Sequence, residues 1–140
     1  MVECEFCSIV AGKLAARVIF DDEETLAFFP QMPAALGHTL VIPKRHVPDL
    51  WVSELTGIIP VMNTVLVVGK AIRSSLRPDG MNLITSSGGV ASQTIFHLHM
   101  HLVPRWLHDH IGKIWPPSKS LGEKVEDSVA DLIRESLSTA

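Results

Sequence analysis

The stretch His97-Leu98-His99-Met100-His101-Leu102-Val103 places three histidines at every second position, with bulky apolar residues between and after them. In an extended chain alternate side chains share one face, so Leu98, Met100 and Leu102 can enter a core while three imidazoles line the other face. A helix would put His99 opposite the other two histidines and mix imidazole with the apolar stripe. The pattern therefore predicts a β-strand.

Successive imidazoles on such a strand lie about 6.6 Å apart, and the outer two lie about 13 Å apart. One tetrahedral ion cannot bind all three at that spacing, although two neighbours can share an ion when other segments supply ligands. Three rings in a row suit an extended anionic substrate. Neutral imidazole is a good nucleophile near pH 7 when one ring nitrogen is protonated and held. The alternative is a structural strand whose histidines face solvent.

Small residues precede the histidines, in the run Ser86-Ser87-Gly88-Gly89-Val90-Ala91-Ser92-Gln93-Thr94. Stretches rich in glycine and serine are commonly plain turns. This one leads directly into the three imidazoles, so its backbone N–H groups and the side chains of Ser92, Gln93 and Thr94 can donate to phosphate oxygens. The two segments together predict phosphate chemistry.

Several motifs resemble the histidine triad (HIT) family in order and spacing. They are Leu26-Ala27-Phe28, Pro33, residues 37–46 (GHTLVIPKRH), Gly80-Met81-Asn82, residues 93–96 (QTIF), the three histidines, Val103-Pro104-Arg105 and Trp115-Pro116-Pro117. The resemblance covers residues 4–117. Its last motif is similar to the end of the branch that hydrolyses nucleoside phosphoramidates.

This resemblance implies a mechanism centred on His99. Its imidazole would attack the α-phosphorus of a small nucleotide conjugate, expel the leaving group and form a nucleotidyl-histidine that water hydrolyses. His101 would contact the phosphate, while Gln93 and Thr94 would donate to its oxygens and to the departing atom. His97 would support His99 from the side.

The resemblance also implies substrate-binding residues. The family's apolar base pocket matches Ile9, Phe28 and Phe29, which would otherwise be ordinary core. Pro30 stands where many members have an aspartate that holds the ribose hydroxyls, and Gln31 is a polar residue that can replace this contact. Two candidate residues of the phosphate loop also depart from the family pattern: Ser86, at a usual asparagine position, and Ser92, at a usual glycine position.

Cys4 and Cys7 are the only cysteines, and their spacing lets both sulfurs face one zinc ion. A thioredoxin-like redox pair would need a preceding strand, which this position near the N-terminus does not offer. Some bacterial HIT proteins resemble this chain in using two cysteines and two histidines, here His46 and His97, which would close a structural tetrahedral site. Two free thiols, or a redox or disulfide pair, stay open as alternatives. No organic cofactor is expected.

Composition bounds the function classes. A chain of 140 residues with 46% hydrophobic residues can form one ordinary domain, and its net charge of −3 gives no electrostatic case for nucleic acid. We expect no signal peptide and no membrane span, because Pro60, Asn63 and Thr64 interrupt the most apolar stretch, residues 58–68. Two cysteines in a chain of this size fit a reducing cytoplasm.

Periodicity and turn signals predict strands near residues 16–21, 25–29, 38–43, 81–85 and 94–103, and a helical turn over residues 7–11. A long helix should have Thr56 as N-cap, carry Pro60 in its first turn and end near Leu76. An amphipathic helix should span residues 123–138. The predicted fold is α+β and HIT-like, with a five-stranded antiparallel sheet, one long helix and an additional C-terminal helix.

The predicted organisation is a catalytic domain over residues 1–117 and a helical extension over residues 118–140. The extension would pack on the same domain or on a dimer, because the resemblance implies a homodimer whose two sheets continue across the interface.

Three functions follow as hypotheses. The first is hydrolysis of nucleoside 5′-phosphoramidates, meaning AMP or GMP joined to an amine. The second is cleavage of dinucleoside polyphosphates at the same phosphorus. The third is a zinc-stabilised nucleotide-binding module with little turnover. A hydrolase with a catalytic metal ion is a further alternative, which predicts that activity is lost on chelation.

Overall fold

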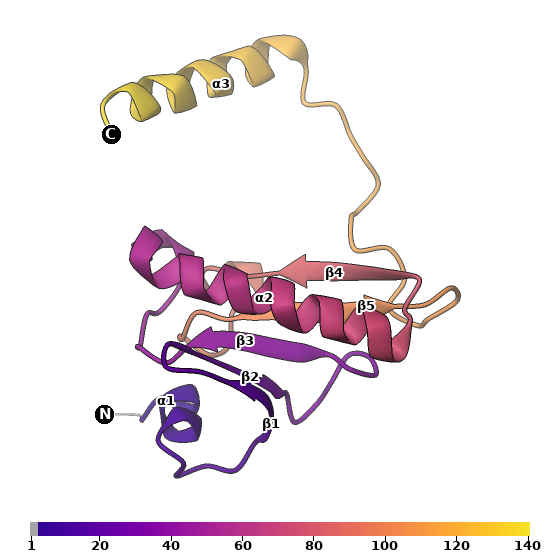
Figure 1. Ribbon diagram of the computed structural model, residues 1–140. Helices are drawn as coiled ribbons and strands as arrows, with labels where there is room; N and C mark the ends of the chain where they lie inside the picture. The colour runs from indigo at the N-terminus through magenta and orange to yellow at the C-terminus, as the bar shows by residue number, and fades with distance from the viewer. Residues whose placement is uncertain (1–2) are drawn as a thin grey trace. The chain divides into compact units, whose positions relative to one another are not determined.

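The structure is a computed structural model that describes residues 3–140 (Figure 1). Its elements in chain order are α1 (Glu5–Val10), β1 (Arg17–Asp21), β2 (Thr25–Phe29), β3 (Thr39–Pro43), the 3₁₀ turn η1 (Leu50–Val52), α2 (Leu55–Leu76), β4 (Gly80–Ile84), the 3₁₀ turn η2 (Gly89–Ala91), β5 (Met100–Arg105) and α3 (Glu123–Ser138).

The five strands form one antiparallel sheet in the order β1-β2-β3-β5-β4. The pairing aligns Val18 with Phe28, Phe28 with Leu40 and Leu40 with His101, so one row of residues crosses four strands. The predicted α+β fold is confirmed, including the sheet, the long helix and the C-terminal helix over residues 123–138.

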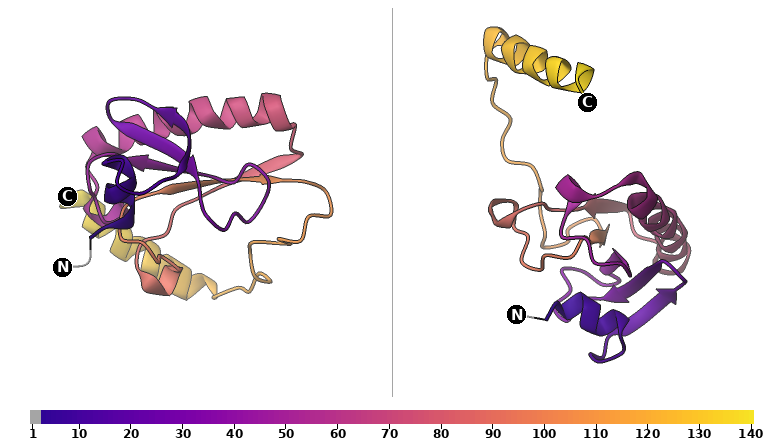
Figure 2. Two further views of the ribbon diagram at one scale, coloured as in Figure 1. Left: turned by 90° about the horizontal axis from the view of Figure 1, so that it is seen from below. Right: turned by 90° about the vertical axis from the view of Figure 1, so that its left-hand side faces the viewer.

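Two hydrophobic clusters lie on opposite faces of the sheet, as the alternation along β2 requires. The helix α2 covers one face of the sheet (Figure 2). Ala27 belongs to the cluster on that face, which includes Val61, Val65 and Leu102. Phe28 belongs to the other cluster, where Phe6 of α1 packs against it. The helix α1 therefore joins the core on the face opposite α2.

Two details of the sequence prediction were wrong. The strand expected over residues 94–103 enters the sheet only at Met100, so His97 and His99 precede β5. The helix α2 begins at Leu55 with Glu54 at the N-cap, so Thr56 lies inside the helix and Pro60 lies beyond the first turn. Pro60 has no N–H to donate, and the carbonyl of Thr56 therefore lacks its helical partner.

By length and composition α2 also meets the criterion for a membrane-spanning helix. The core helix of a soluble domain meets the same criterion. One face of α2 packs on the sheet through the buried side chains of Val61, Val65, Val68 and Ile72. This packing favours a core helix.

The chain forms two compact units, with the boundary between His110 and Ile111. The first unit holds the sheet, α1 and α2. The second unit contains α3, whose Val125, Val129, Leu132 and Ile133 side chains are exposed. The predicted boundary after residue 117 falls inside the second unit, and packing of α3 on a domain or a dimer stays a prediction.

Candidate functional site

His99 lies at the entry to β5 with its side chain only 8% exposed. Its Nδ1 lies 2.7 Å from the carbonyl oxygen of His97. Because a carbonyl only accepts, the proton is on Nδ1 and the lone pair is on Nε2. Burial lowers the pKa of His99, which keeps the ring neutral near pH 7. His99 thus presents a free lone pair, as the proposed nucleophile requires.

The backbone around His99 is held from both sides. The Thr85 hydroxyl donates to the carbonyl oxygen of His99 at 2.9 Å, and the Leu98 N–H donates to the carbonyl of Val47 at 2.6 Å. Sequence reasoning missed Thr85, which carries no motif of its own. These bonds replace sheet pairing at this point and fix the position of the imidazole.

His101 contacts His99 and a fourth histidine, His38. The rings of His99 and His101 lie 4.8 Å apart between centroids, and His38 Nε2 lies 2.9 Å from His101 Nδ1. The Ala34 N–H donates to His38 Nδ1 at 2.9 Å, so the His38 proton is on Nε2. His38 therefore donates to His101 Nδ1, and the proton of His101 is on Nε2, ready to donate to an anion.

Sequence reasoning did not assign His38 to the site, although it lies in the family-like stretch over residues 37–46. Burial lowers the pKa of His38. Burial, together with His99 and His38, lowers the pKa of His101 to about 4. All three rings are consequently neutral near pH 7, as this hydrogen-bond chain requires.

A cavity of about 770 Å³ adjoins this face of the sheet. All three predicted base-pocket residues line it: Ile9, Phe28 and Phe29. Thr94, Pro30 and Gln31 also line it, whereas Ser86 and Ser92 are not among the lining residues. Phe6 lines the cavity and also reaches His99, since its ring centroid lies 5.2 Å from that of His99.

The loop before the histidines is shaped by Gln93, which is buried. Its side-chain N–H groups donate to the carbonyls of Pro48, at 2.7 Å, and Ile95, at 3.2 Å, while its Oε1 accepts from the Gly88 N–H at 2.8 Å. Donation by Gln93 to phosphate would require these bonds to exchange, and it stays a prediction. Ser92 follows η2 with a positive φ of 71°, a conformation that favours glycine.

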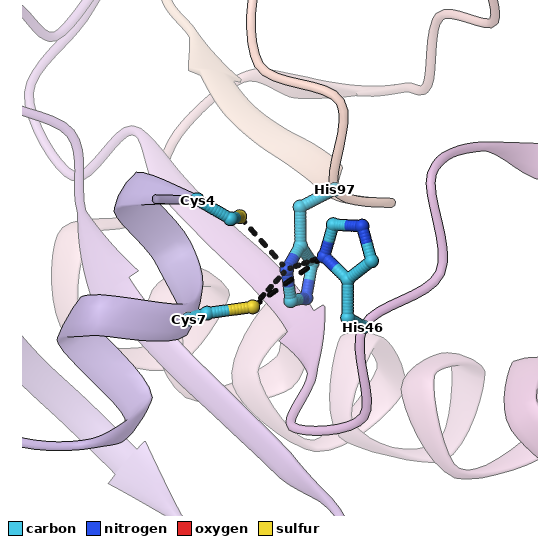
Figure 3. A group of neighbouring side chains, drawn as sticks. All are labelled: Cys4, Cys7, His46 and His97. Atoms are coloured by element: carbon cyan, nitrogen blue, oxygen red, sulfur yellow. Dashed lines mark hydrogen bonds between the residues drawn. The ribbon is translucent and has the colours of Figure 1, made fainter. Parts of the chain in front are cut away.

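The four predicted metal ligands form one cluster (Figure 3). Cys4 lies at the N-cap of α1 and Cys7 within it, His46 follows β3, and His97 precedes β5. One ligand atom from each residue lies within 4.8 Å of the others. Sequence spacing alone could not show that these three segments meet.

The side chains of the cluster are oriented for ligation. His97 Nε2 donates to the Pro43 carbonyl at 2.8 Å, which leaves the Nδ1 lone pair facing the thiols. Burial and the neighbouring Cys4 raise the pKa of Cys7, so its thiolate is disfavoured at neutral pH unless a cation offsets the charge. The arrangement suits a metal ion.

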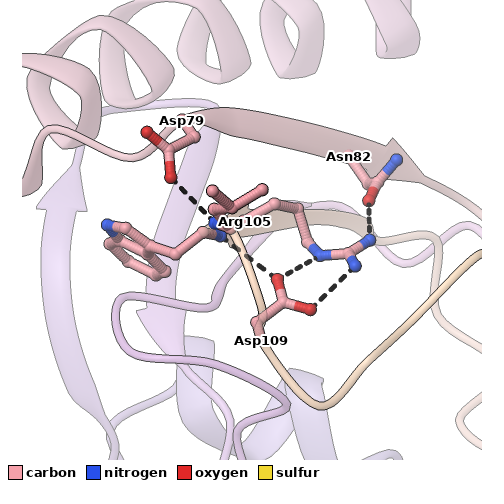
Figure 4. Close-up of polar contacts among 6 residues, drawn as sticks. Asp79, Asn82, Arg105 and Asp109 are labelled. Atoms are coloured by element: carbon pink, nitrogen blue, oxygen red, sulfur yellow. Dashed lines mark hydrogen bonds and ion pairs between the residues drawn. The ribbon is translucent and has the colours of Figure 1, made fainter.

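A second polar network anchors the turn after β5 (Figure 4). The Arg105 guanidinium donates to both carboxylate oxygens of Asp109, at 2.6 and 2.9 Å, and to Asn82 Oδ1 at 2.8 Å. Asp79 accepts from the Leu107 N–H at 2.8 Å. These contacts tie β4 to β5 and play no direct part in the histidine cluster.

The profile of the HIT domain family matches residues 11–108. The chain belongs to the HIT domain family. Protein hit of Bacillus subtilis (strain 168) is 36% identical over 115 residues, which span 80% of this chain and 78% of that protein. The family resemblance seen in the sequence is therefore confirmed.

Solved HIT structures have the same fold. A HIT family protein from Bacillus anthracis is 33% identical with a TM-score of 0.87, over 96% of this chain and 97% of that one. A Zn-bound histidine triad family protein from Mycobacterium smegmatis is 36% identical with a TM-score of 0.74, over 83% of this chain and 84% of that one. Solved relatives of this HIT protein therefore share its fold over most of the chain.

Proposed function

We propose that this HIT protein is a nucleotidyl hydrolase that acts at the α-phosphorus of nucleoside 5′-phosphoramidates. The observation that carries the proposal is the orientation of His99, whose Nδ1 proton is held by the His97 carbonyl while Nε2 is free. The cavity of about 770 Å³ beside it has an apolar wall that suits a nucleobase.

The reaction has two steps. His99 Nε2 forms a bond to the α-phosphorus as the phosphorus–nitrogen bond to the amine breaks, and the amine leaves with a proton taken from solvent, which the water of the second step gives back. Water then attacks the nucleotidyl-histidine, which releases the nucleoside monophosphate and regenerates the neutral imidazole. Over both steps the reaction consumes one water and releases one amine and one nucleoside monophosphate. The covalent intermediate divides one difficult displacement at phosphorus into two easier ones.

The remaining residues bind and orient the substrate in this proposal. The Nε2 proton of His101 points away from His38 and donates to a nonbridging phosphate oxygen. Thr94 donates from the cavity wall, and Ser86 and Ser92 support the phosphate loop. Ile9, Phe28 and Phe29 hold the base, while Gln31, which lines the cavity beside Pro30, takes over contact with the ribose.

We also propose that the cysteine and histidine cluster holds a structural zinc ion. Tetrahedral bonds of about 2.3 Å to sulfur and about 2.0 Å to nitrogen place sulfur and nitrogen about 3.5 Å apart and two nitrogens about 3.3 Å apart. Three of the four sulfur–nitrogen distances here are 3.4, 3.5 and 3.6 Å, and His46 Nδ1 lies 3.3 Å from His97 Nδ1. A closed set of four protein ligands supplies stability and leaves no position for substrate. The Zn-bound relative supports this assignment.

We further infer a homodimer in the cytoplasm. In the described chain β4 forms one edge of the sheet and exposes Leu83, and an unpaired edge favours pairing with a second copy. Cys4 and Cys7 form no disulfide and lie together with two histidines, an arrangement that a reducing compartment preserves.

The test is turnover of an adenosine 5′-phosphoramidate that carries a fluorescent amine. We expect the zinc-loaded wild type to release amine, His99→Ala to lose at least about a thousandfold in kcat, and the exposed-histidine control His110→Ala to retain full activity. Mass spectrometry after an alkaline quench should find adenylate on His99. A folded, zinc-loaded wild type without turnover would refute the proposal, and cleavage of dinucleoside polyphosphates instead would favour that rival.

A further inference from the structure

Phe6 is a buried ring that touches both halves of the site. It is only 2% exposed and lies between Cys4 and Cys7 in the sequence of α1. Its ring meets His99 at a centroid distance of 5.2 Å and His97 at 5.8 Å, with interplanar angles of 89° and 68°. Such edge contacts between buried rings are specific in geometry, so a shift of Phe6 changes the surroundings of His99.

His97 provides a second link between the cluster and the nucleophile. Its Nδ1 lies 3.5 Å from the Cys4 sulfur and 3.6 Å from the Cys7 sulfur. The carbonyl of the same residue accepts the Nδ1 proton of His99. A ligand that fixes the His97 side chain therefore also restrains the group that orients His99.

The helix α1 itself forms a wall of the cavity, through Glu5, Phe6 and Ile9. It has only six residues, and its N-cap Cys4 makes no side-chain capping bond. Helices this short are not stable without tertiary contacts. On the sheet side α1 is held by the buried Phe6 and the partly buried Ile9 and Val10, and at its N-terminal end the two thiols face the histidines. A ligand that joins the thiols to the histidines therefore restrains the N-terminal end of the cavity wall.

We propose that metal binding at the cluster and nucleotide binding in the cavity are coupled through α1, with Phe6 as the positioning residue that transmits the coupling to His99. The metal clamps α1 through Cys4 and Cys7, which holds the cavity wall and the Phe6 ring in place. The proposal rests on the proposed function in one respect, since it takes the cavity ligand to be a nucleotide. The metal then has a role in substrate binding beyond stabilising the fold.

Coupling between two binding sites is reciprocal, which makes the test strict. The probes are AMP and zinc. Calorimetry measures AMP affinity for the full chain, zinc-loaded and chelator-stripped, and a chelating dye measures zinc affinity with and without AMP. We expect zinc to tighten AMP binding at least about fivefold and AMP to tighten zinc binding by the same factor.

Variants of α1 test whether Phe6 transmits the coupling between the two binding sites. Phe6→Leu keeps all four ligands, and we expect it to keep zinc binding while the coupling factor falls toward one. Ser8→Ala is the matched control, because Ser8 lies in the same helix and is not among the residues that line the cavity; it should keep the coupling. The ring-proton resonances of His99 give a further readout. They should shift on zinc addition in the wild type and in Ser8→Ala, and should shift less in Phe6→Leu, which keeps only the link through His97.

Each of the other outcomes contradicts the proposed coupling. AMP that binds equally well with and without zinc overturns the coupling and leaves the proposed function intact. Loss of the sheet's circular dichroism on stripping would mean that the metal holds the whole fold, which also overturns a local coupling. A zinc-loaded protein that binds no AMP overturns the proposed function and the coupling with it.

Discussion

His38 Nε2 lies 2.9 Å from His101 Nδ1, and this contact fixes which nitrogen of His101 carries the proton. The direction of the bond follows from the Ala34 N–H, which occupies His38 Nδ1 and leaves only Nε2 as a donor. His101 must then carry its own proton on Nε2. The strand that places His101 in the sheet and the strand that follows His38 are neighbours, so the sheet register sets this contact.

Loss of the His38 donor should slow the reaction more than it weakens nucleotide binding. We expect His38→Phe to lower kcat/KM about 5- to 150-fold, as the loss of a buried hydrogen bond worth about 1–3 kcal/mol requires. AMP affinity should fall by less, because the apolar wall that would hold the base does not include His38. Steady-state kinetics and calorimetry measure the two quantities. His38→Gln, which keeps a donor, should recover part of the rate, and an unchanged kcat/KM in His38→Phe would contradict the role.

Stability should fall as the pH drops from about 6.5 to about 4. The pKa of His101 is lowered to about 4 in the folded chain, so between these values the unfolded chain binds a proton that the folded chain does not. Each such proton raises the unfolding constant about tenfold per pH unit. Burial also lowers the pKa of His38, which makes the free energy of unfolding depend more steeply on pH. The lowered pKa of Asp22 acts only below about 3.8, outside this window. Urea denaturation at pH 7, 6 and 5 measures how the free energy of unfolding depends on pH. This dependence should be weaker in His101→Asn.

The sequence predicts the elements more reliably than the contacts between them. The alternating histidines predicted a strand, yet only the part from Met100 onward joins the sheet. The physical reason is that the Leu98 N–H and the His97 carbonyl are used by Val47 and by the His99 ring, which a regular ladder would not allow. Such competition between side chains and backbone leaves no mark in a period-two pattern.

The cluster of Cys4, Cys7, His46 and His97 was predicted from the resemblance, and the structure brings the four together. The sequence did not predict a role for Phe6 in the site, because an aromatic residue between two cysteines is ordinary core in most sequences. Its contacts with the histidines depend on how α1 docks on the sheet, which is a tertiary property.

Relief of backbone strain at Ser92 should stabilise the protein. A left-handed conformation costs a residue with a side chain about 1–2 kcal/mol, while glycine there costs about 0.5–1 kcal/mol in added freedom of the unfolded chain. We expect Ser92→Gly to raise the free energy of unfolding by about 0.5–1 kcal/mol. Ser86→Gly is the control, since Ser86 is not among the residues with positive φ, and it should lower stability. A lower free energy of unfolding in both variants would show that Ser92 makes contacts that outweigh its backbone strain.

Zinc should bind with one ion per chain and raise the melting temperature. At free zinc about a thousand times the dissociation constant, ligand binding adds about 4 kcal/mol to the free energy of unfolding. We expect Cys7→Ser to lose this increment and most bound zinc, whereas Ser8→Ala, one residue further along α1, should keep both. Metal analysis after gel filtration and thermal denaturation with and without a chelator give the readouts. Equal zinc content in Cys7→Ser and wild type would contradict the ligand assignment.

Arg105 should matter for stability through the geometry of its guanidinium. It donates two hydrogen bonds to the Asp109 carboxylate and one to Asn82 Oδ1, and the side chains of Arg105 and Asp109 are 19% and 13% exposed. A lysine keeps the charge but cannot make this planar, bidentate contact. Arg105→Lys should therefore lower the melting temperature by several degrees and leave KM unchanged, because the network lies outside the cavity lining. Arg134→Lys is the matched control, since its ion pair with Asp131 is 73% and 77% exposed and exposed pairs contribute little. Equal melting temperatures for the two variants would show that charge alone holds the turn after β5.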